Sequence, residues 1–111
     1  MLIALGDIHV QVAHREVVRQ IMRDTQTRVT RSAGCLSYVF AETLEEPGHF
    51  VLLQQWSDRA ALEEHYRSEA FASYQARIAE HLVRSSDLRL HEVQSSLQPV
   101  DHAPIEISQE D

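Results

Sequence analysis

Seven histidines and one cysteine are the side chains of this 111-residue chain best suited to proton transfer, nucleophilic attack or metal binding. The histidines show neither HExxH spacing nor a tight grouping with cysteine, so we expect no metal site. His9 and His91 could become neighbours if the first and last strands pair, and two imidazoles could then hold a metal. The simpler interpretation is two half-exposed strand histidines. Cys35 follows a glycine at a strand start, where a thiol packs as a small apolar group unless a nearby base generates the thiolate.

Trp56 and His65 have the spacing that most suggests a shared site. Trp56 is the only tryptophan and ends a predicted strand, and His65 lies nine residues later, in a predicted helix. Because that helix must pack over the same sheet, the imidazole and the indole could reach one pocket. The alternative is structural: Trp56 packs in the core with its indole N–H satisfied, and His65 is a structural or solvated helix residue.

Hydrophobic periodicity predicts the elements that would position these residues. Apolar residues that alternate with polar ones indicate strands, and apolar residues at three- and four-residue steps indicate helices. Gly34 suits the end of the first helix. Residues 45–48 form a polar turn, and Ser57 and Asp58 offer an N-cap for the second helix. The predicted elements are strands over 2–12, 35–43, 49–56 and 88–93, a helix over 14–32, and a second helix from 57 to about 83 with a bend at 68–69.

This order is the ferredoxin-like β-α-β-β-α-β arrangement, an α+β fold with the helices on one face of an antiparallel sheet. The first three strands carry apolar residues on both sides, so we expect the second face to be buried against another copy in a homodimer. Residues 1–98 would form this domain. Residues 99–111, with four acidic residues and no arginine, would form a flexible or partner-wrapping tail.

Composition excludes several classes of function. The formal net charge is −7 and all ten basic residues are arginines, so no nucleic-acid-binding patch is evident and a Schiff-base lysine is impossible. The three glycines stand alone, which argues against dinucleotide and phosphate-binding loops. The apolar run at residues 1–5 is too short for a membrane or secretory segment, so we expect a cytoplasmic protein without a membrane partner.

Three stretches of the chain, taken in order, resemble the antibiotic biosynthesis monooxygenase family. They read G-C-L-x-Y at residues 34–38, P-x-x-F and W-S within 47–57, and A-L-x-x-H and S-x-x-F within 61–71. The resemblance spans residues 2 to about 93. It implies a dimeric α+β barrel in which two ferredoxin-like protomers pair sheet to sheet. The family's enzymes include quinol and aromatic-polyketide monooxygenases that use oxygen without flavin, haem or metal.

The resemblance also assigns residues. His65 matches the family's helix histidine, and Trp56 matches the strand-end tryptophan that shapes the pocket. Gln54 stands where many members have glutamate, and Ala70 stands where several have a second histidine, so two titratable groups are missing. The haem-degrading branch uses an asparagine, a tryptophan and a ligating histidine. Here Asp7 or Ile8, His65 and Gln75 occupy those positions, so we do not expect haem degradation.

We therefore expect a cofactor-independent monooxygenase that acts with molecular oxygen on a small aromatic quinol or polyketide-like phenol. His65 would be the general base, because an imidazole titrates near neutral pH. The other expected site residues are aromatic walls from Trp56, Tyr38, Phe40 and Phe71, and hydrogen-bonding partners from Asp7, Gln54 and Tyr74. The alternatives are a non-catalytic barrel that binds a small ligand, which the absence of titratable groups at Gln54 and Ala70 favours, and an isomerase of a small carbonyl metabolite.

Overall fold

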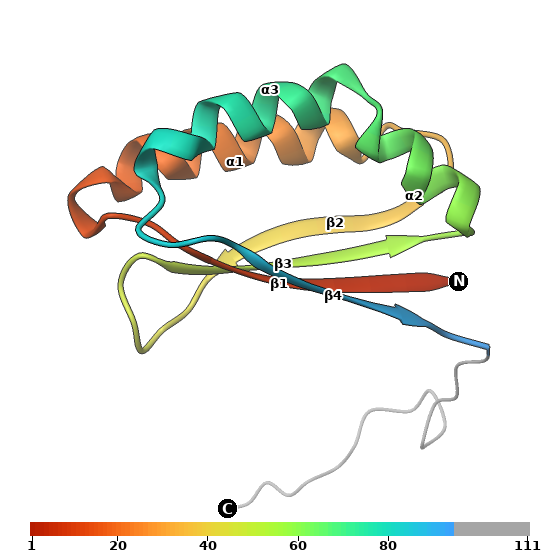
Figure 1. The fold of residues 1–111 in the computed structure, drawn as a ribbon, viewed down its shortest axis with the longest axis horizontal. Coiled ribbons are helices and arrows are strands. Elements are labelled where there is room, and N and C mark those ends of the chain that lie inside the picture. The colour runs from red at the N-terminus through yellow and green to blue at the C-terminus, as the bar shows by residue number, and fades with distance from the viewer. Residues whose placement is uncertain (95–111) are drawn as a thin grey trace, which may run out of the picture.

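The chain folds into one four-stranded antiparallel sheet with its helices on one face, as a computed structural model of residues 1–94 shows (Figure 1). The elements are β1 (Leu2–His9), α1 (Arg15–Val29), β2 (Cys35–Glu42), β3 (His49–Trp56), α2 (Arg59–Tyr66), α3 (Glu69–Ile78) and β4 (Asp87–Glu92). The strand order is β2-β3-β1-β4. The predicted ferredoxin-like α+β fold is confirmed, with the second helix divided in two. The predicted tail, 99–111, lies outside the described residues.

Side-chain alternation gives the sheet two different faces. In β1, Leu2, Ala4 and Ile8 are buried under the helices, whereas Leu5 between them is exposed on the other side. Strand β3, which pairs with β1, has the same alternation: buried Trp56 lies opposite Leu2, and buried Phe50 lies opposite Ile8. The hydrophobic core therefore lies between the sheet and the helices.

Two side-chain caps fix the break between α2 and α3. The Asp58 carboxylate accepts a hydrogen bond from the Ala61 N–H (2.8 Å) at the start of α2. Ser68 Oγ accepts from the Phe71 N–H (3.2 Å) at the start of α3, and it donates to the carbonyl of His65 (2.6 Å). The predicted bend is therefore the boundary between α2 and α3, with His65 before the turn and Phe71 after it.

Several predicted bounds were too long. β1 ends at His9, because Val10 forms only an isolated bridge to Leu82 and a 3₁₀ turn (Val12–His14) follows. α1 ends at Val29, and α3 ends at Ile78 before a second 3₁₀ turn (Ala79–His81). The suggestion that His9 and His91 are neighbours is wrong: His91 lies opposite Ile3, and His9 lies opposite His49.

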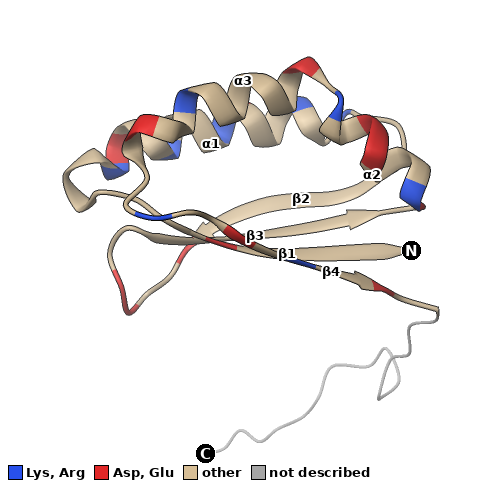
Figure 2. Ribbon diagram, viewed as in Figure 1, with Lys and Arg blue, Asp and Glu red and all other residues tan. Residues whose placement is uncertain are grey.

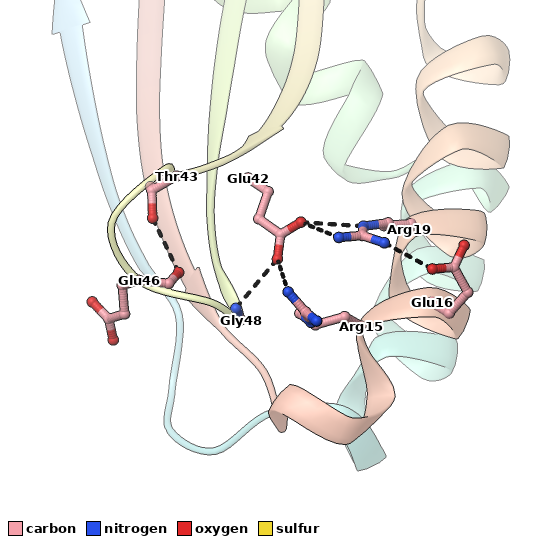
Figure 3. A network of polar contacts seen from close by, with 7 residues as sticks. All are labelled: Arg15, Glu16, Arg19, Glu42, Thr43, Glu46 and Gly48. Atoms are coloured by element: carbon pink, nitrogen blue, oxygen red, sulfur yellow. Dashed lines mark hydrogen bonds and ion pairs between the residues drawn. The ribbon is translucent and has the colours of Figure 1, made fainter.

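An ion-pair network ties the end of β2 to α1 (Figure 3). Glu42 Oε1 accepts hydrogen bonds from Arg19 Nε (3.1 Å) and Nη2 (2.6 Å), and Glu42 Oε2 lies 3.6 Å from Arg15 Nη1. The Gly48 N–H donates to the same carboxylate (3.3 Å). The hydrogen bonds from Arg19 hold the pKa of the Glu42 carboxyl below its usual value. The network thereby anchors the β2–β3 connection to the helix layer.

Gly34 provides a test of how α1 connects to the sheet. Its φ is +80°, and a Cβ there would lie 2.5 Å from Ala61 Cβ and 2.8 Å from Ser57 Oγ. We expect Gly34→Ala to lower the free energy of unfolding by about 2 kcal/mol or more, because backbone strain and steric conflict add. Urea denaturation would measure this, with Gly6→Ala as the control, since the nearest atom to its added Cβ is a movable Leu88 methyl group. Equal losses in the two variants would contradict the prediction.

Candidate functional site

A cavity of about 390 Å³ lies on the helix-covered side of the sheet. Strands β1, β2 and β3, helix α3 and the segment that leads into β4 all contribute to its walls. Its lining is mostly apolar, as is usual for small-molecule sites. Of the residues expected from the sequence, Tyr38, Gln54, Phe71 and Tyr74 line it.

His65 lies directly behind one wall of this cavity, in an aromatic cage formed by Trp56, Tyr38, Tyr66 and Phe71. Its ring stacks on Trp56, with centroids 5.0 Å apart and planes inclined by 29°. The centroids of Phe71, Tyr38 and Tyr66 lie 5.1, 5.4 and 5.5 Å from that of His65. Only 3% of His65 is exposed. The structure therefore brings Trp56 and His65 together, as their spacing suggested.

Neither ring nitrogen of His65 has a hydrogen-bond partner among the described residues. Burial lowers the pKa of His65 to about 4, so the imidazole is neutral at pH 7. A buried polar group without a partner costs about 1–3 kcal/mol. Buried groups are nearly always paired, so this ring is an exception that calls for an explanation. A neutral imidazole can accept a proton at one nitrogen and donate at the other.

Gln54 is oriented by the indole. Trp56 Nε1 donates a hydrogen bond to Gln54 Oε1 (2.9 Å), and both side chains are buried on the helix-covered face of β3. Residues two apart in a strand share a face, which explains the pairing. Because the amide oxygen is engaged by Trp56, the NH₂ group of Gln54 is the donor that this residue can offer to the cavity.

Tyr38 adds a second polar group to the cavity. Its hydroxyl is buried and has no hydrogen-bond partner among the described residues. Burial raises the pKa of Tyr38 and of Tyr74, so both phenols remain protonated. Tyr38 also packs against His65, and it can therefore contact the imidazole and a cavity ligand at once.

Other expected residues lie elsewhere. Asp7 faces away from the helices and its Oδ1 lies 2.7 Å from His49 Nε2, so it does not line the cavity. Phe40 lies behind Tyr38 and Tyr74, with centroids 5.6 Å from each. Trp56 is fully buried beneath His65. Burial raises the pKa of the Cys35 thiol, which disfavours the thiolate.

Tyr66 is the cage residue that the sequence reasoning missed. It lines the cavity and contacts both His65 and Phe71, the latter at a centroid distance of 5.1 Å. The sequence feature that could have identified Tyr66 is its position directly after His65. An i, i+1 pair in an ideal helix diverges, however, and contact arises here because α2 ends at Tyr66.

Solved structures place this fold in a well-populated class of α+β proteins. A proposed antibiotic biosynthesis monooxygenase from Deinococcus radiodurans superposes with a TM-score of 0.85 at 21% identity, over 91% of this chain and all of that one. A protein from Mycobacterium tuberculosis gives 0.80 at 23% identity, over 87% of this chain and 98% of the other. A further antibiotic biosynthesis monooxygenase structure gives 0.80 at 25% identity, over 86% and 100%.

The family model for antibiotic biosynthesis monooxygenases matches residues 1–77. The chain belongs to this family, as the resemblance implied. An uncharacterised protein from Synechocystis is 27% identical over 60 residues, which are 54% of this chain and 41% of that protein. The matched region thus spans less than half the length of this curated relative. None of the helices within residues 1–94 is long and apolar enough to cross a membrane.

The burial of His65 predicts a pH-dependent stability. The unfolded imidazole has a pKa of about 6.5 and the folded one about 4, so between these values the unfolded chain binds the extra proton. The free energy of unfolding should therefore fall as the pH drops from 6.5 to 4, by on the order of 3 kcal/mol from this group.

His65→Phe isolates this contribution, because it keeps an aromatic ring in the cage and removes both unpartnered nitrogens. We expect the variant to be at least as stable as the wild type at pH 7 and to lose less stability between pH 6.5 and 4. Urea denaturation at several pH values would measure the difference. Parallel pH profiles for the two proteins would contradict the assignment.

Proposed function

We propose that the protein oxygenates a small aromatic quinol or polyketide-like phenol in the 390 Å³ cavity, with His65 as the general base and no cofactor. The observation that carries this proposal is the neutral, buried imidazole of His65, which is held against the cavity wall and has no hydrogen-bond partner within residues 1–94. Family membership supports the reaction class. The aromatic and apolar lining supports the substrate class.

Access to His65 requires a small side-chain movement. The imidazole lies behind Tyr38, Tyr66 and Phe71, which line the cavity. Tyr66 is 37% exposed at the edge of the cage, so its ring can rotate without opening the core. A phenol that displaced it would stack among the aromatic rings and place its hydroxyl near the imidazole. The substrate would then supply the hydrogen bond that His65 lacks.

Proton transfer would begin the reaction. His65 accepts the phenolic proton, and the Tyr38 hydroxyl and the Gln54 amide donate hydrogen bonds to the resulting oxyanion. These donors matter because an imidazole whose pKa is about 4 is a weak base for a phenol. Donors fixed in a water-poor site favour the phenolate more than water-exposed donors would. The protonated Tyr38 suits this role, since burial keeps its phenol neutral.

The phenolate is electron-rich and can reduce oxygen directly. The substrate carbon bonds to one oxygen atom, the O–O bond breaks, and the second oxygen atom leaves as water with the two hydrogens that the substrate loses. The substrate supplies all the electrons, so the balance needs no external reductant. The apolar cavity would exclude water and orient the ring.

Oxygen consumption tests the reaction. Purified protein would be mixed with a panel of hydroquinones and anthrones in the presence of a chelator, beside an autoxidation control without protein. We expect uptake above autoxidation, a loss of at least about 100-fold in His65→Phe, and a loss of roughly 10-fold or more in Tyr38→Phe. His91→Gln, an exposed histidine on β4, is the matched control and should retain full activity. Uptake that is unchanged in His65→Phe would exclude His65 as the base.

Ligand binding without catalysis is the second candidate, because His65 lies behind the cavity wall and Gln54 carries no charge. In that case the hydroquinones and anthrones would quench Trp56 fluorescence without oxygen uptake. An isomerase of a carbonyl compound would convert its substrate without consuming oxygen, with His65 as a proton shuttle.

We also propose that a second copy covers the outer face of the sheet, the face turned away from the helices. That face exposes Leu5, Val39 and Leu53 by 42%, 43% and 36%, and no described element covers it (Figure 1). Charged residues lie mainly on the helices and loops, and the central strands carry few (Figure 2). The apolar part of this face, formed by Leu5, Val39 and Leu53, favours sheet-to-sheet pairing.

Leu53→Glu tests the dimer. A carboxylate at the centre of an apolar interface would be buried without a partner, so we expect the variant to elute as a monomer where the wild type has twice the mass of one chain. Light scattering coupled to gel filtration would measure both masses. Val17→Glu, at a 47%-exposed position on α1, should leave the dimer intact. A wild-type monomer would exclude the proposed assembly.

A further inference from the structure

A second group of titratable side chains lies on the outer face of the sheet, away from the cavity. It consists of His9 at the end of β1, His49 at the start of β3, Glu46 in the loop between β2 and β3, and Asp7 two residues before His9. We refer to His9, His49 and Glu46 as the histidine cluster. The proposed reaction uses none of these residues.

Strand register brings the two histidines together. His9 lies opposite His49 in the β1–β3 pair, and their rings stack with centroids 4.2 Å apart and planes inclined by only 11°. The Glu46 carboxylate bridges them: Oε2 lies 3.6 Å from His9 Nδ1, and Oε1 lies 3.6 Å from His49 Nδ1. Both imidazoles therefore turn the same nitrogen toward one carboxylate.

The loop backbone holds Glu46 in this position. The Glu46 carbonyl accepts hydrogen bonds from the His49 N–H (3.1 Å) and from Thr43 Oγ1 (3.1 Å), the latter visible in Figure 3. The Thr43 N–H donates in turn to the His49 carbonyl (2.9 Å). Glu46 is thus tied to the strand that carries His49, although its side chain is 58% exposed.

From this geometry we propose that the histidine cluster binds a divalent transition-metal ion of the zinc type. Its three ligand atoms lie within 4.8 Å of one another. Two ligands of a tetrahedral zinc ion, with bonds of about 2.0–2.1 Å, lie about 3.3–3.4 Å apart. The two N–O distances of 3.6 Å are close to this value. Because the two ring planes are inclined by only 11°, the imidazoles must rotate so that both Nδ1 lone pairs point at one ion. Two imidazoles with one carboxylate then leave a fourth position for water.

Asp7 provides the outer support that histidine ligands need. Its Oδ1 lies 2.7 Å from His49 Nε2, and its Oδ2 lies 3.9 Å from Arg89 Nη2. A carboxylate that accepts from one ring nitrogen fixes the tautomer and makes the other nitrogen a better ligand. His49 Nδ1, the nitrogen turned toward Glu46, is therefore the one left to bind the ion.

The donor set also selects the class of ion. Imidazole nitrogens favour zinc and its neighbours, whereas Mg²⁺ and Ca²⁺ require six or more oxygen ligands. The ion would join the ends of β1 and β3 to the β2–β3 loop. Since the cluster and the cavity lie on opposite faces of the sheet, the ion would take no part in the oxygen chemistry.

Metal titration of the untagged, chelator-treated full chain tests the proposal. We expect calorimetry at pH 7.5 to give one Zn²⁺ per chain, and Co²⁺ to give the visible absorption of a four-coordinate site. Glu46→Gln, in an exposed loop, should weaken Zn²⁺ binding by at least 10-fold, and Asp7→Asn should weaken it by about 10- to 100-fold. Circular dichroism would confirm that both near-isosteric variants remain folded.

Two control histidines separate this cluster from other sites. His91→Gln alters an exposed histidine on the same face and should leave the affinity unchanged. His81→Gln removes one partner of the His14–His81 pair, whose Nδ1 atoms lie 3.0 Å apart, and should also have no effect. Absence of stoichiometric Zn²⁺ binding, binding that persists in Glu46→Gln, binding lost in His81→Gln, or equal binding of Mg²⁺ would each overturn the proposal.

Discussion

Every helix within residues 1–94 lies on one face of the sheet, and each strand must therefore serve two different environments. Even-numbered residues, such as Leu2 and Ile8 in β1 and Trp56 in β3, are buried beneath the helices. Odd-numbered residues, such as Leu5 and Leu53, remain exposed on the other face. Because a one-residue slip would exchange the two sets, the register is fixed by the free energy of burial. The positions of the cavity, the aromatic cage and the histidine cluster all depend on this register.

His65 makes the folded core less stable than an apolar ring at the same position would. An apolar ring in the aromatic cage would keep the stacking on Trp56 and avoid the cost of two buried nitrogens that have no partner in the part of the chain the structure describes. The Tyr38 hydroxyl, on β2, is likewise buried without a hydrogen-bond partner among the described residues. Two unsatisfied polar groups in contact, beside an apolar cavity, are explained together if a ligand with its own hydroxyl supplies both partners.

The sequence predicted what periodicity controls, and it failed where register and turns decide. The strand order and the meeting of Trp56 with His65 followed from alternation and from a helix packed on the sheet. His9 and His91 lie apart because β1 and β4 run antiparallel: His91, near the end of β4, lies opposite Ile3 near the start of β1. Asp7 was assigned to the cavity although it shares the parity of His9, so strict alternation would have placed it on the outer face.

Parity also keeps the two proposed sites chemically separate within a single strand. Gly6 faces the cavity, where an added Cβ would come within 3.2 Å of a Leu88 methyl group, so the missing side chain leaves part of the cavity open. Asp7, the next residue, points to the opposite face and orients His49. A side chain at position 6 would therefore act on the aromatic substrate, and one at position 7 on the metal ligand. Because the sheet separates them, the proposed oxygen chemistry and the proposed metal binding share no residue, and a substitution can test one without altering the other.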